Sequence, residues 1–478
     1  MELHQKYPVL KDHIVASRIN TPNRVKIITY DNITGRKKPI NEKVFTFLEQ
    51  ASGSHTFEEI SEILFRKKNK SKKKALPELE NLVNRLVQEG VVSLNDSPLR
   101  RARAPPLSVT AVHHLQNVYL ETTRECNLHC EHCYSDAGSP RENELSFAEI
   151  RSLIDQLAQI GVLSLTLTGG EPLLHPRLFD IMKYARKKRL SLLLFTNGTL
   201  IIPQIAQKLY QLHVYRAAVS IDGPDAGIHD QIRGVEGAFQ KALRAIILLK
   251  NFEIPTQVNI CLSRTNYAKF KEILFLMKHL GVTQFQVHPV TFTGRGGPVQ
   301  NTEGRAGRGE QGNQGTKDFC ITPVEYLKAL RLLHDFKVKE LNMEERREIS
   351  YSLRDINCGI GKQSVTVKSD GTVVPCPLFG EDASLGNIRE HSLLDIWNDS
   401  PLLNTLRSMN VFETHPCKDC QFSGICKGGC IGDVYRRSGA FSCYDPYTCA
   451  SCQADKEHTV PVEVDELPPE EKLTISFV

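Results

Sequence analysis

The stretch that decides the fold is Cys126-Asn127-Leu128-His129-Cys130-Glu131-His132-Cys133, in which three cysteines recur with the spacing C-x3-C-x2-C. It directly follows Val118–Thr123, a run that predicts a β-strand. Three thiolates on one short loop can each bind one iron of a cubane, whereas iron–sulfur clusters usually have four cysteine ligands. The spacing therefore predicts a cluster whose fourth iron is open to an exogenous ligand. A zinc site that uses His129 or His132 as its fourth ligand is the alternative.

The same stretch opens a regular alternation of strands and helices. Six segments read as strands: Val118–Thr123, Leu163–Thr168, Leu190–Phe195, Ala217–Ile221, Gln257–Leu262 and Gln284–Val290. Amphipathic helices fill the gaps; one has a capping box of Ser146 and Glu149, and another is expected to start at Asn266. Six strand–helix repeats predict parallel strands in an open sheet or a barrel. Functional groups then gather on the loops after the carboxyl ends of the strands.

A second motif, Thr168-Gly169-Gly170-Glu171-Pro172, ends the second strand. Its glycines let the backbone approach a ligand closely, and its glutamate supplies a carboxylate acceptor. Placed after C-x3-C-x2-C, this motif resembles the radical S-adenosylmethionine (SAM) superfamily over residues 117–290. The resemblance implies an α/β fold with a partial (β/α)6 barrel. It also implies a [4Fe-4S] cluster on Cys126, Cys130 and Cys133, with SAM on the open iron.

The resemblance further implies the cofactor-binding residues Gly169, Gly170, Glu171, Asn197 and Ser220, the first three holding the methionine amine of SAM. Members of the superfamily are enzymes. A reduced cluster passes one electron to SAM, and the resulting 5′-deoxyadenosyl radical abstracts hydrogen from an unactivated C–H bond. Arg233 is expected at the surface, with contact to the SAM carboxylate as the alternative. No carboxylate or histidine is singled out as a general acid or base, so further catalytic residues remain unassigned.

Nine of the fourteen cysteines lie in the C-terminal part of the chain. Their spacing is similar to that of the SPASM extension of radical SAM enzymes, over about residues 350–455. The resemblance implies one or two auxiliary [4Fe-4S] clusters. The first would use Cys358, Cys376 and Cys430, and the second Cys417, Cys420, Cys426 and Cys443. The first set lacks a fourth ligand, so that cluster would have either an open iron or a distant ligand such as Cys320. In the second set, Cys449 or Cys452 could replace Cys443. Cys261 falls in a predicted strand and is expected to be a core residue. Two structural zinc sites are the alternative.

The N-terminal segment resembles a PqqD-like recognition element for ribosomally made, modified peptides (RiPPs), over residues 7–95. Thr56 and Glu59 form a capping box at the start of one of its helices. The resemblance implies a winged helix-turn-helix module that binds a peptide leader as an added strand. An ordinary winged-helix module with other partners is the alternative. The expected division is 1–97 peptide recognition, 98–116 linker, 117–345 radical SAM barrel, 346–455 SPASM domain and 456–478 acidic tail.

The composition of the chain limits the class of protein and its cellular location. The chain has 478 residues, 40% hydrophobic and 24% charged, which is typical of a soluble protein of two or three domains. A net charge of +5 is too small to indicate nucleic-acid binding, and we find neither a membrane span nor a signal peptide. Clustered cysteines in such a chain indicate metal binding rather than disulfides. We therefore expect a cytoplasmic protein, with a flexible glycine-rich loop at 294–318.

The function expected from these features is an oxidoreductase that matures a precursor peptide. The radical would modify a side chain, with a thioether or carbon–carbon crosslink as the product. Reduction would come from a flavodoxin- or ferredoxin-type electron donor. Tetrapyrrole modification in a haem pathway is the alternative, as is oxidative maturation of a protein substrate of the kind that activates anaerobic sulfatases. The sequence does not identify the substrate.

Overall fold

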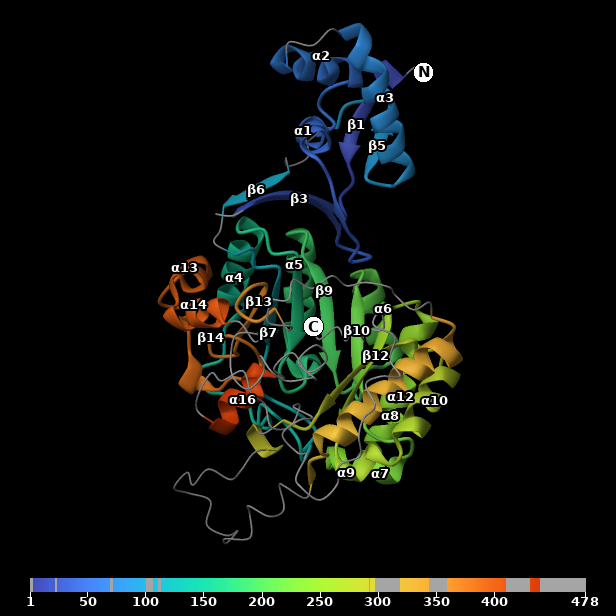
Figure 1. The fold of residues 1–478 in the computed structure, drawn as a ribbon, viewed down its shortest axis with the longest axis vertical. Coiled ribbons are helices and arrows are strands. Elements are labelled where there is room, and N and C mark those ends of the chain that lie inside the picture. The colour runs from blue at the N-terminus through green and yellow to red at the C-terminus, as the bar shows by residue number, and fades with distance from the viewer. Residues whose placement is uncertain are drawn as a thin grey trace, which may run out of the picture.

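The chain folds into an N-terminal α/β unit, a central partial barrel and a C-terminal extension of the barrel sheet (Figure 1). The computed structural model describes residues 3–21, 24–68, 72–99, 106–110, 113–291, 293–296, 319–343, 359–409 and 430–438. The expected acidic tail 456–478 lies outside these residues, as does most of the glycine-rich loop 294–318.

Six parallel strands form the central sheet. They are β7 (Asn117–Glu121), β8 (Ser164–Thr168), β9 (Ser191–Thr196), β10 (Arg216–Ser220), β11 (Thr256–Leu262) and β12 (Gln284–Pro289). Neighbours in the sequence are neighbours in the sheet, as Val118↔Leu165 and Ala218↔Phe195 illustrate. All six predicted strands are confirmed, and their ends lie within two residues of the predicted ones. Their alternation with helices is the arrangement expected of right-handed crossovers.

Helices cover the outer face of this sheet. They are α4 (Phe147–Gln159), α5 (Leu178–Lys187), α6 (Pro203–Gln211), α7 (Ala226–Arg233), α8 (Ala238–Asn251), α9 (Arg264–Tyr267), α10 (Phe270–His279) and α12 (Pro323–Leu341). The capping box of Ser146 and Glu149 is confirmed at the start of α4. The cap expected at Asn266 is wrong, because Ser263 caps α9 and Asn266 lies inside it. The side-chain oxygen of Asn266 completes the capping box by accepting the N–H of Ser263, and its amide donates hydrogen bonds to the carbonyls of Asp222 and Cys261.

The C-terminal segment adds three strands to the other edge of the sheet. They are β13 (Ser364–Val367), β14 (Thr372–Val374) and β15 (Gly386–Asn387), followed by α13 (Leu393–Asp399), α14 (Pro401–Ser408) and α16 (Ile431–Ser438). Strand β13 runs parallel to β7, with Val365 opposite Val118, and the other two are antiparallel. Trp397 of α13 is fully buried, and it belongs to the same hydrophobic core as the barrel strands. The extension is therefore part of the barrel's folding unit.

The N-terminal unit combines two small sheets with three helices. Its elements are β1 (Tyr7–Leu10), β2 (Ile14–Thr21), β3 (Arg24–Asp31), β4 (Lys37–Pro39), α1 (Glu42–Gln50), α2 (Phe57–Lys68), α3 (Lys72–Gln88), β5 (Val92–Asn95) and β6 (Leu107–Thr110). Strands β1 and β5 pair, and a second sheet has the order β4-β3-β2-β6. The capping box of Thr56 and Glu59 is present at the start of α2. Within the expected linker 98–116, residues Leu107–Thr110 form β6 and pair with β2.

The N-terminal unit contacts the barrel at the amino ends of its strands. Ile28 and Tyr30 of β3 form an apolar cluster with Leu163, which immediately precedes β8. The Asn32 amide donates to the carbonyl of Arg189, just before β9, at 3.0 Å. The cysteine loop follows the carboxyl end of β7. The N-terminal unit and the cysteine loop therefore lie at opposite ends of the barrel strands (Figure 1).

Candidate functional site

The three cysteines of the first motif lie on one ordered loop after β7. The Cys126 N–H donates to the carbonyl of Gly138 at 2.8 Å, and the Cys133 N–H donates to the carbonyl of Cys130 at 3.3 Å. The Cys133 Sγ accepts the N–H of Ala137 at 3.4 Å. Cys130 is buried and the other two thiols are half-buried, in a small apolar cluster with Leu128. The loop thus holds three thiols in one sheltered region.

The glycine motif lies directly against this loop. The Gly170 N–H donates to the carbonyl of Thr123, and the Glu171 N–H donates to the carbonyl of Glu125, each at 2.8 Å. A Cβ at Gly170 would lie 2.2 Å from the carbonyl oxygen of Glu125. Gly169 has φ +143°, where a Cβ would come within 2.3 Å of the carbonyl oxygen of Thr123. Glycine is needed here because the two backbones approach each other closely.

Glu171 is a buried carboxylate that accepts hydrogen bonds from the neighbouring turns. Its side chain is fully buried; one oxygen accepts hydrogen bonds from the Thr196 hydroxyl and the Leu173 N–H, and the other from the Asn197 N–H. Burial raises the pKa of this carboxyl to about 7, although the hydrogen bonds act to lower it. Both oxygens therefore have partners within the chain, and the residue orients the turn after β9.

Asn197 and Ser220 lie at the same end of the barrel. The Asn197 amide donates to the side-chain carbonyl of Asn127 in the cysteine loop at 2.9 Å, and its own oxygen accepts from Thr199. Ser220 is the last residue of β10 and is half-buried, opposite Asn259 of β11. All five residues expected to bind SAM therefore follow or end barrel strands β8, β9 and β10, and the Gly169–Glu171 segment and Asn197 contact the cysteine loop.

The donor set fits an iron–sulfur cluster. Burial raises the pKa of the Cys126 thiol to about 11 and raises that of Cys130, so metal binding must release their protons. Within the described ranges, no three His, Cys, Asp or Glu side chains converge as the ligands of one metal ion do. Cubane ligands need not converge, because each binds a different iron. Of the two histidines of the zinc alternative, His132 directs its Nε2 at the buried carboxylate of Asp222, at 3.5 Å.

A buried ion pair stands beside Cys130. Arg233, the last residue of α7, pairs through Nη2 with Asp222 Oδ2 at 2.7 Å, and its Nη1 donates to Cys130 Sγ at 3.7 Å. The expected surface position of Arg233 is wrong: the residue is 8% exposed. Its charge is accommodated because Asp222 is fully buried beside it. Asp222 and Arg233 belong to no sequence motif, so their pairing could not be predicted from spacing. The available signal was their position, Asp222 just after β10 and Arg233 at the end of α7.

Arg295 also holds the cysteine loop. It belongs to the segment expected to be flexible, yet Gly294–Gly296 form a short 3-10 turn. Its Nε donates to the carbonyl of Cys130 at 2.8 Å, and its Nη1 donates to Ala137 O at 2.8 Å and pairs with Asp136 at 3.1 Å. The described part of this segment therefore stabilises the cysteine loop through Arg295.

The structure describes two of the expected auxiliary-cluster cysteines. Cys376 follows β14, and Cys430 immediately precedes α16. They lie close together, because a Cβ on Gly432 in the first turn of α16 would be 3.3 Å from Cys376 Sγ. The remaining expected ligands lie outside the described residues: Cys358, Cys417, Cys420, Cys426 and Cys443, as well as Cys449 and Cys452. Cys261, expected in the core, is half-buried in β11, where its N–H donates to Asp222 Oδ1 at 2.8 Å, and Cys320 is buried.

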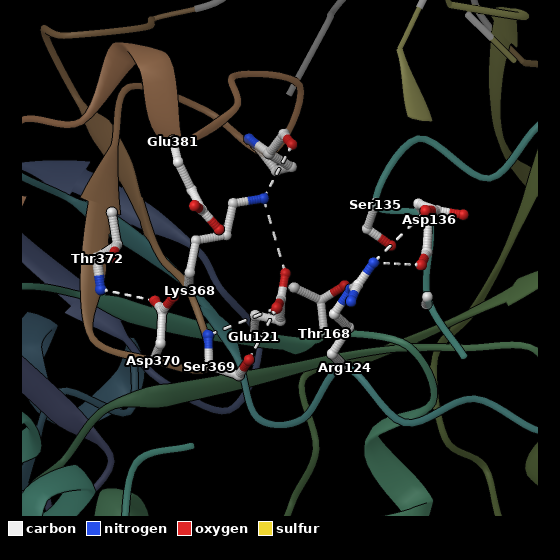
Figure 2. A network of polar contacts seen from close by, with 12 residues as sticks. Glu121, Arg124, Ser135, Asp136, Thr168, Lys368, Ser369, Asp370, Thr372 and Glu381 are labelled. Atoms are coloured by element: carbon white, nitrogen blue, oxygen red, sulfur yellow. Dashed lines mark hydrogen bonds and ion pairs between the residues drawn. The ribbon is translucent and has the colours of Figure 1, made fainter. Parts of the chain in front are cut away.

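Polar contacts connect the end of β7 with the segment after β13, and Figure 2 shows Glu121, Lys368 and Ser369 among them. Lys368, at the end of β13, lies 3.7 Å from Glu121 Oε2 and donates to the carbonyl of Pro377, next to Cys376. The Ser369 hydroxyl donates to Glu121 Oε1 at 3.0 Å. Glu121 ends β7 and so begins the cysteine loop. This network could not be predicted from the sequence, because its members are isolated polar residues far apart along the chain.

Comparisons with known proteins decide the family. Residues 120–277 match the radical SAM superfamily, and residues 358–421 match SPASM, an iron–sulfur cluster-binding domain. An AdoMet-dependent heme synthase of Nitratidesulfovibrio vulgaris is 31% identical over 336 residues, which cover 68% of this chain and 90% of that protein. The chain belongs to the radical SAM superfamily. As a member it is an enzyme that uses SAM and a [4Fe-4S] cluster, and its SPASM domain binds auxiliary iron–sulfur clusters.

Two further matches are a bacteriocin biosynthesis protein and a structure solved with a precursor peptide. The subtilosin biosynthesis protein AlbA of Bacillus subtilis is 31% identical over 317 residues, covering 65% of this chain and 66% of that protein. The crystal structure of SuiB from Streptococcus suis, bound to the precursor peptide SuiA, matches 93% of this chain and 100% of that chain, with a TM-score of 0.62 and 15% identity. The second likeness concerns the fold alone. No helix among the described residues is long and apolar enough to cross a membrane.

Proposed function

We propose that this radical SAM enzyme modifies a side chain of a ribosomally synthesised precursor peptide, with a thioether or carbon–carbon crosslink as the product. The observation that carries the peptide assignment is the N-terminal α/β unit on the amino ends of the barrel strands. The fold likeness to SuiB extends over 93% of the chain and so includes most of this unit. The relationship to AlbA supports the same substrate class.

The cluster and SAM would be held by the residues after the first four barrel strands. Cys126, Cys130 and Cys133 would ligate the cluster, and the Gly169–Glu171 segment, Asn197 and Ser220 would hold SAM. When bound, these groups supply a 5′-deoxyadenosyl radical that abstracts hydrogen from a C–H bond. The protein's part is to orient and shelter the reacting groups. Glu171 fixes the turn at Asn197, and Arg295 braces the loop.

The C-terminal cysteines would hold the auxiliary clusters, with Cys376 and Cys430 in the first. The Glu121–Lys368 pair fixes the Cys376 loop against the start of the first cysteine loop. Clusters held there would supply an acceptor for the electron left after hydrogen abstraction. Reduction would come from a flavodoxin- or ferredoxin-type donor.

The N-terminal unit would bind the peptide leader in the manner of a PqqD-like element. Strand β5 pairs with β1 on one edge, and among the described residues no strand pairs with its other edge. Helix α3 packs beside β5. An open strand edge next to a helix is the arrangement that accepts a peptide as an added strand.

Tetrapyrrole modification is the second candidate, and the relationship to the heme synthase favours it. The peptide and tetrapyrrole proposals are distinguished by supplying the anaerobically reconstituted enzyme with each class of substrate. One arm uses short Cys- or aromatic-rich peptides encoded beside its gene, and the other uses an iron coproporphyrin. We expect 5′-deoxyadenosine formation to be coupled to loss of two hydrogens from a peptide. Coupling to the porphyrin alone would overturn the peptide proposal.

A deletion tests the role of the N-terminal unit. Removing residues 1–95 should weaken peptide binding, measured by fluorescence anisotropy, while uncoupled SAM cleavage continues. Unchanged peptide affinity would overturn the leader-binding role.

A further inference from the structure

Arg233 is fastened to the cysteine loop by its backbone as well as by its side chain. The carbonyl of Arg233 accepts the N–H of His129 at 3.1 Å, and the carbonyl of Ile232 accepts the N–H of Glu131 at the same distance. The loop thereby satisfies two carbonyls that the end of α7 would leave unpaired. Because these bonds flank Cys130 on both sides, the distance between Arg233 and Cys130 is set by the fold.

The helix end is shaped for this contact. Gly234 ends α7 with φ +71°, and a Cβ there would lie 2.7 Å from the carbonyl oxygen of His129. Any other residue would therefore push the loop away from the helix. The close approach brings the guanidinium of Arg233 to Cys130 Sγ.

Asp222 fixes the other side of the guanidinium. Its Oδ1 accepts the N–H of Cys261 at 2.8 Å, and its own N–H donates to Nδ1 of His229 at 3.1 Å. Burial acts to raise the pKa of the Asp222 carboxyl, but the charge of Arg233 and a contribution from His132 hold it below its usual range. Asp222 is thus an anion that anchors Arg233 at Oδ2 and leaves Nη1 directed at the sulfur.

We propose that Arg233 tunes the reduction potential of the cluster by directing the positive end of the buried Arg233–Asp222 pair at Cys130. The inference rests on the proposed cluster ligands. The potential of an iron–sulfur cluster depends on local charge and on hydrogen bonds to its sulfurs. Reduction adds negative charge, which a donor and a cation at Cys130 stabilise, so Arg233 raises the potential. Asp222 limits this effect, because its negative charge lies on the far side of the guanidinium. Both are positioning residues.

Two variants should shift the potential in opposite directions. Arg233→Gln removes the cation and should move the midpoint to a more negative value; Asp222→Asn removes the anion and should move it to a more positive one. The readout is a reductive titration of the reconstituted enzyme, followed by electron paramagnetic resonance. The relevant signal is the component that is absent from a Cys126→Ala variant. A merely structural contribution would not give shifts of opposite sign.

Arg216→Gln is the matched control. Arg216 is a half-buried arginine that begins β10, the strand whose other end leads to Asp222. Its Nη groups donate to the side-chain oxygen of Gln257 and to the Tyr215 hydroxyl, both at 2.9 Å. We expect this variant to leave the midpoint potential unchanged.

The outcomes separate the two proposals. If no signal disappears in Cys126→Ala, the proposed cluster site is wrong. If the signal is present and Arg233→Gln has the wild-type potential, the tuning inference is overturned. If Arg233→Gln cannot hold a cluster, Arg233→Lys and Asp222→Asn decide. We expect Arg233→Lys to remain close to wild type because it keeps the charge. A potential for Asp222→Asn at or below that of wild type would overturn the inference.

Discussion

Replacing Gly170 with alanine should separate the cysteine loop from the segment after β8. The new Cβ would lie 2.2 Å from the carbonyl oxygen of Glu125 and 2.6 Å from that of Arg124, and neither backbone group can rotate away. Relief of these contacts requires the two segments to move apart. The hydrogen bonds from the N–H groups of Gly170 and Glu171, both now 2.8 Å long, would be broken.

The cost follows from these contacts. Two backbone hydrogen bonds contribute about 1 kcal/mol each, and overpacking adds about 1–3 kcal/mol, so we expect Gly170→Ala to destabilise the loop by about 3–5 kcal/mol. The assay is the iron retained after anaerobic reconstitution and desalting, together with the rate of 5′-deoxyadenosine formation. Both should fall sharply, with far-ultraviolet circular dichroism unchanged.

Gly138→Ala is the matched control. Gly138 lies on the same loop, where its carbonyl accepts the N–H of Cys126, but a Cβ there would meet no atom within 4 Å. We expect this variant to keep its iron and its SAM cleavage. If Gly170→Ala behaved like Gly138→Ala, the reasoning that glycine is required by the approach of the two backbones would be refuted.

Two further predictions concern buried charges. Lys368→Met removes the cationic partner of the buried Glu121 carboxylate, which should lower the free energy of unfolding in urea by about 3–5 kcal/mol. The double variant Lys368→Met/Glu121→Gln should recover most of that loss. If the double variant lost as much stability as Lys368→Met alone, the two side chains would not interact. Burial and the nearby Arg233 lower the pKa of buried His229 from 6.5 to about 4, so on acidification the unfolded chain takes up a proton before the folded one does. Stability is therefore lost as the pH falls below 6.5, by roughly 2 kcal/mol between pH 7 and pH 5. His229→Gln should remove that part of the pH dependence of the unfolding midpoint and exposed His391→Gln should not; identical pH profiles for all three proteins would contradict the pKa assignment.

The barrel could be predicted from sequence because its signals are local. The segment 163–168, in which leucine alternates with serine and threonine, predicts a strand on its own, and four of the five residues of β8 are buried because both faces of the parallel sheet are covered. The cysteine loop and the Gly169–Glu171 motif were also predictable, since each is contiguous. What the sequence could not give was their mutual contact, in which the glycines approach the chain's own backbone.

The charged groups of the site could not be predicted because they depend on distant pairings. Arg233 reads as a surface residue until α7 brings it against Asp222, and Lys368 reads as an ordinary lysine until β13 pairs with β7 beside Glu121. Asn266 does not begin a helix for the same reason: its side chain is held within α9, where its oxygen completes the capping box with Ser263 and its amide donates to the carbonyls of Asp222 and Cys261. Each outcome was decided by burial and by the demand that buried polar groups find partners.

The most direct test of the central claim compares the wild-type enzyme with Cys126→Ala after anaerobic reconstitution. Iron, sulfide and 5′-deoxyadenosine are measured for both. We predict that the variant loses SAM cleavage and the iron of one cluster, while the auxiliary iron bound by the C-terminal cysteines is retained. Continued SAM cleavage by Cys126→Ala would contradict the assignment of the cluster to Cys126, Cys130 and Cys133.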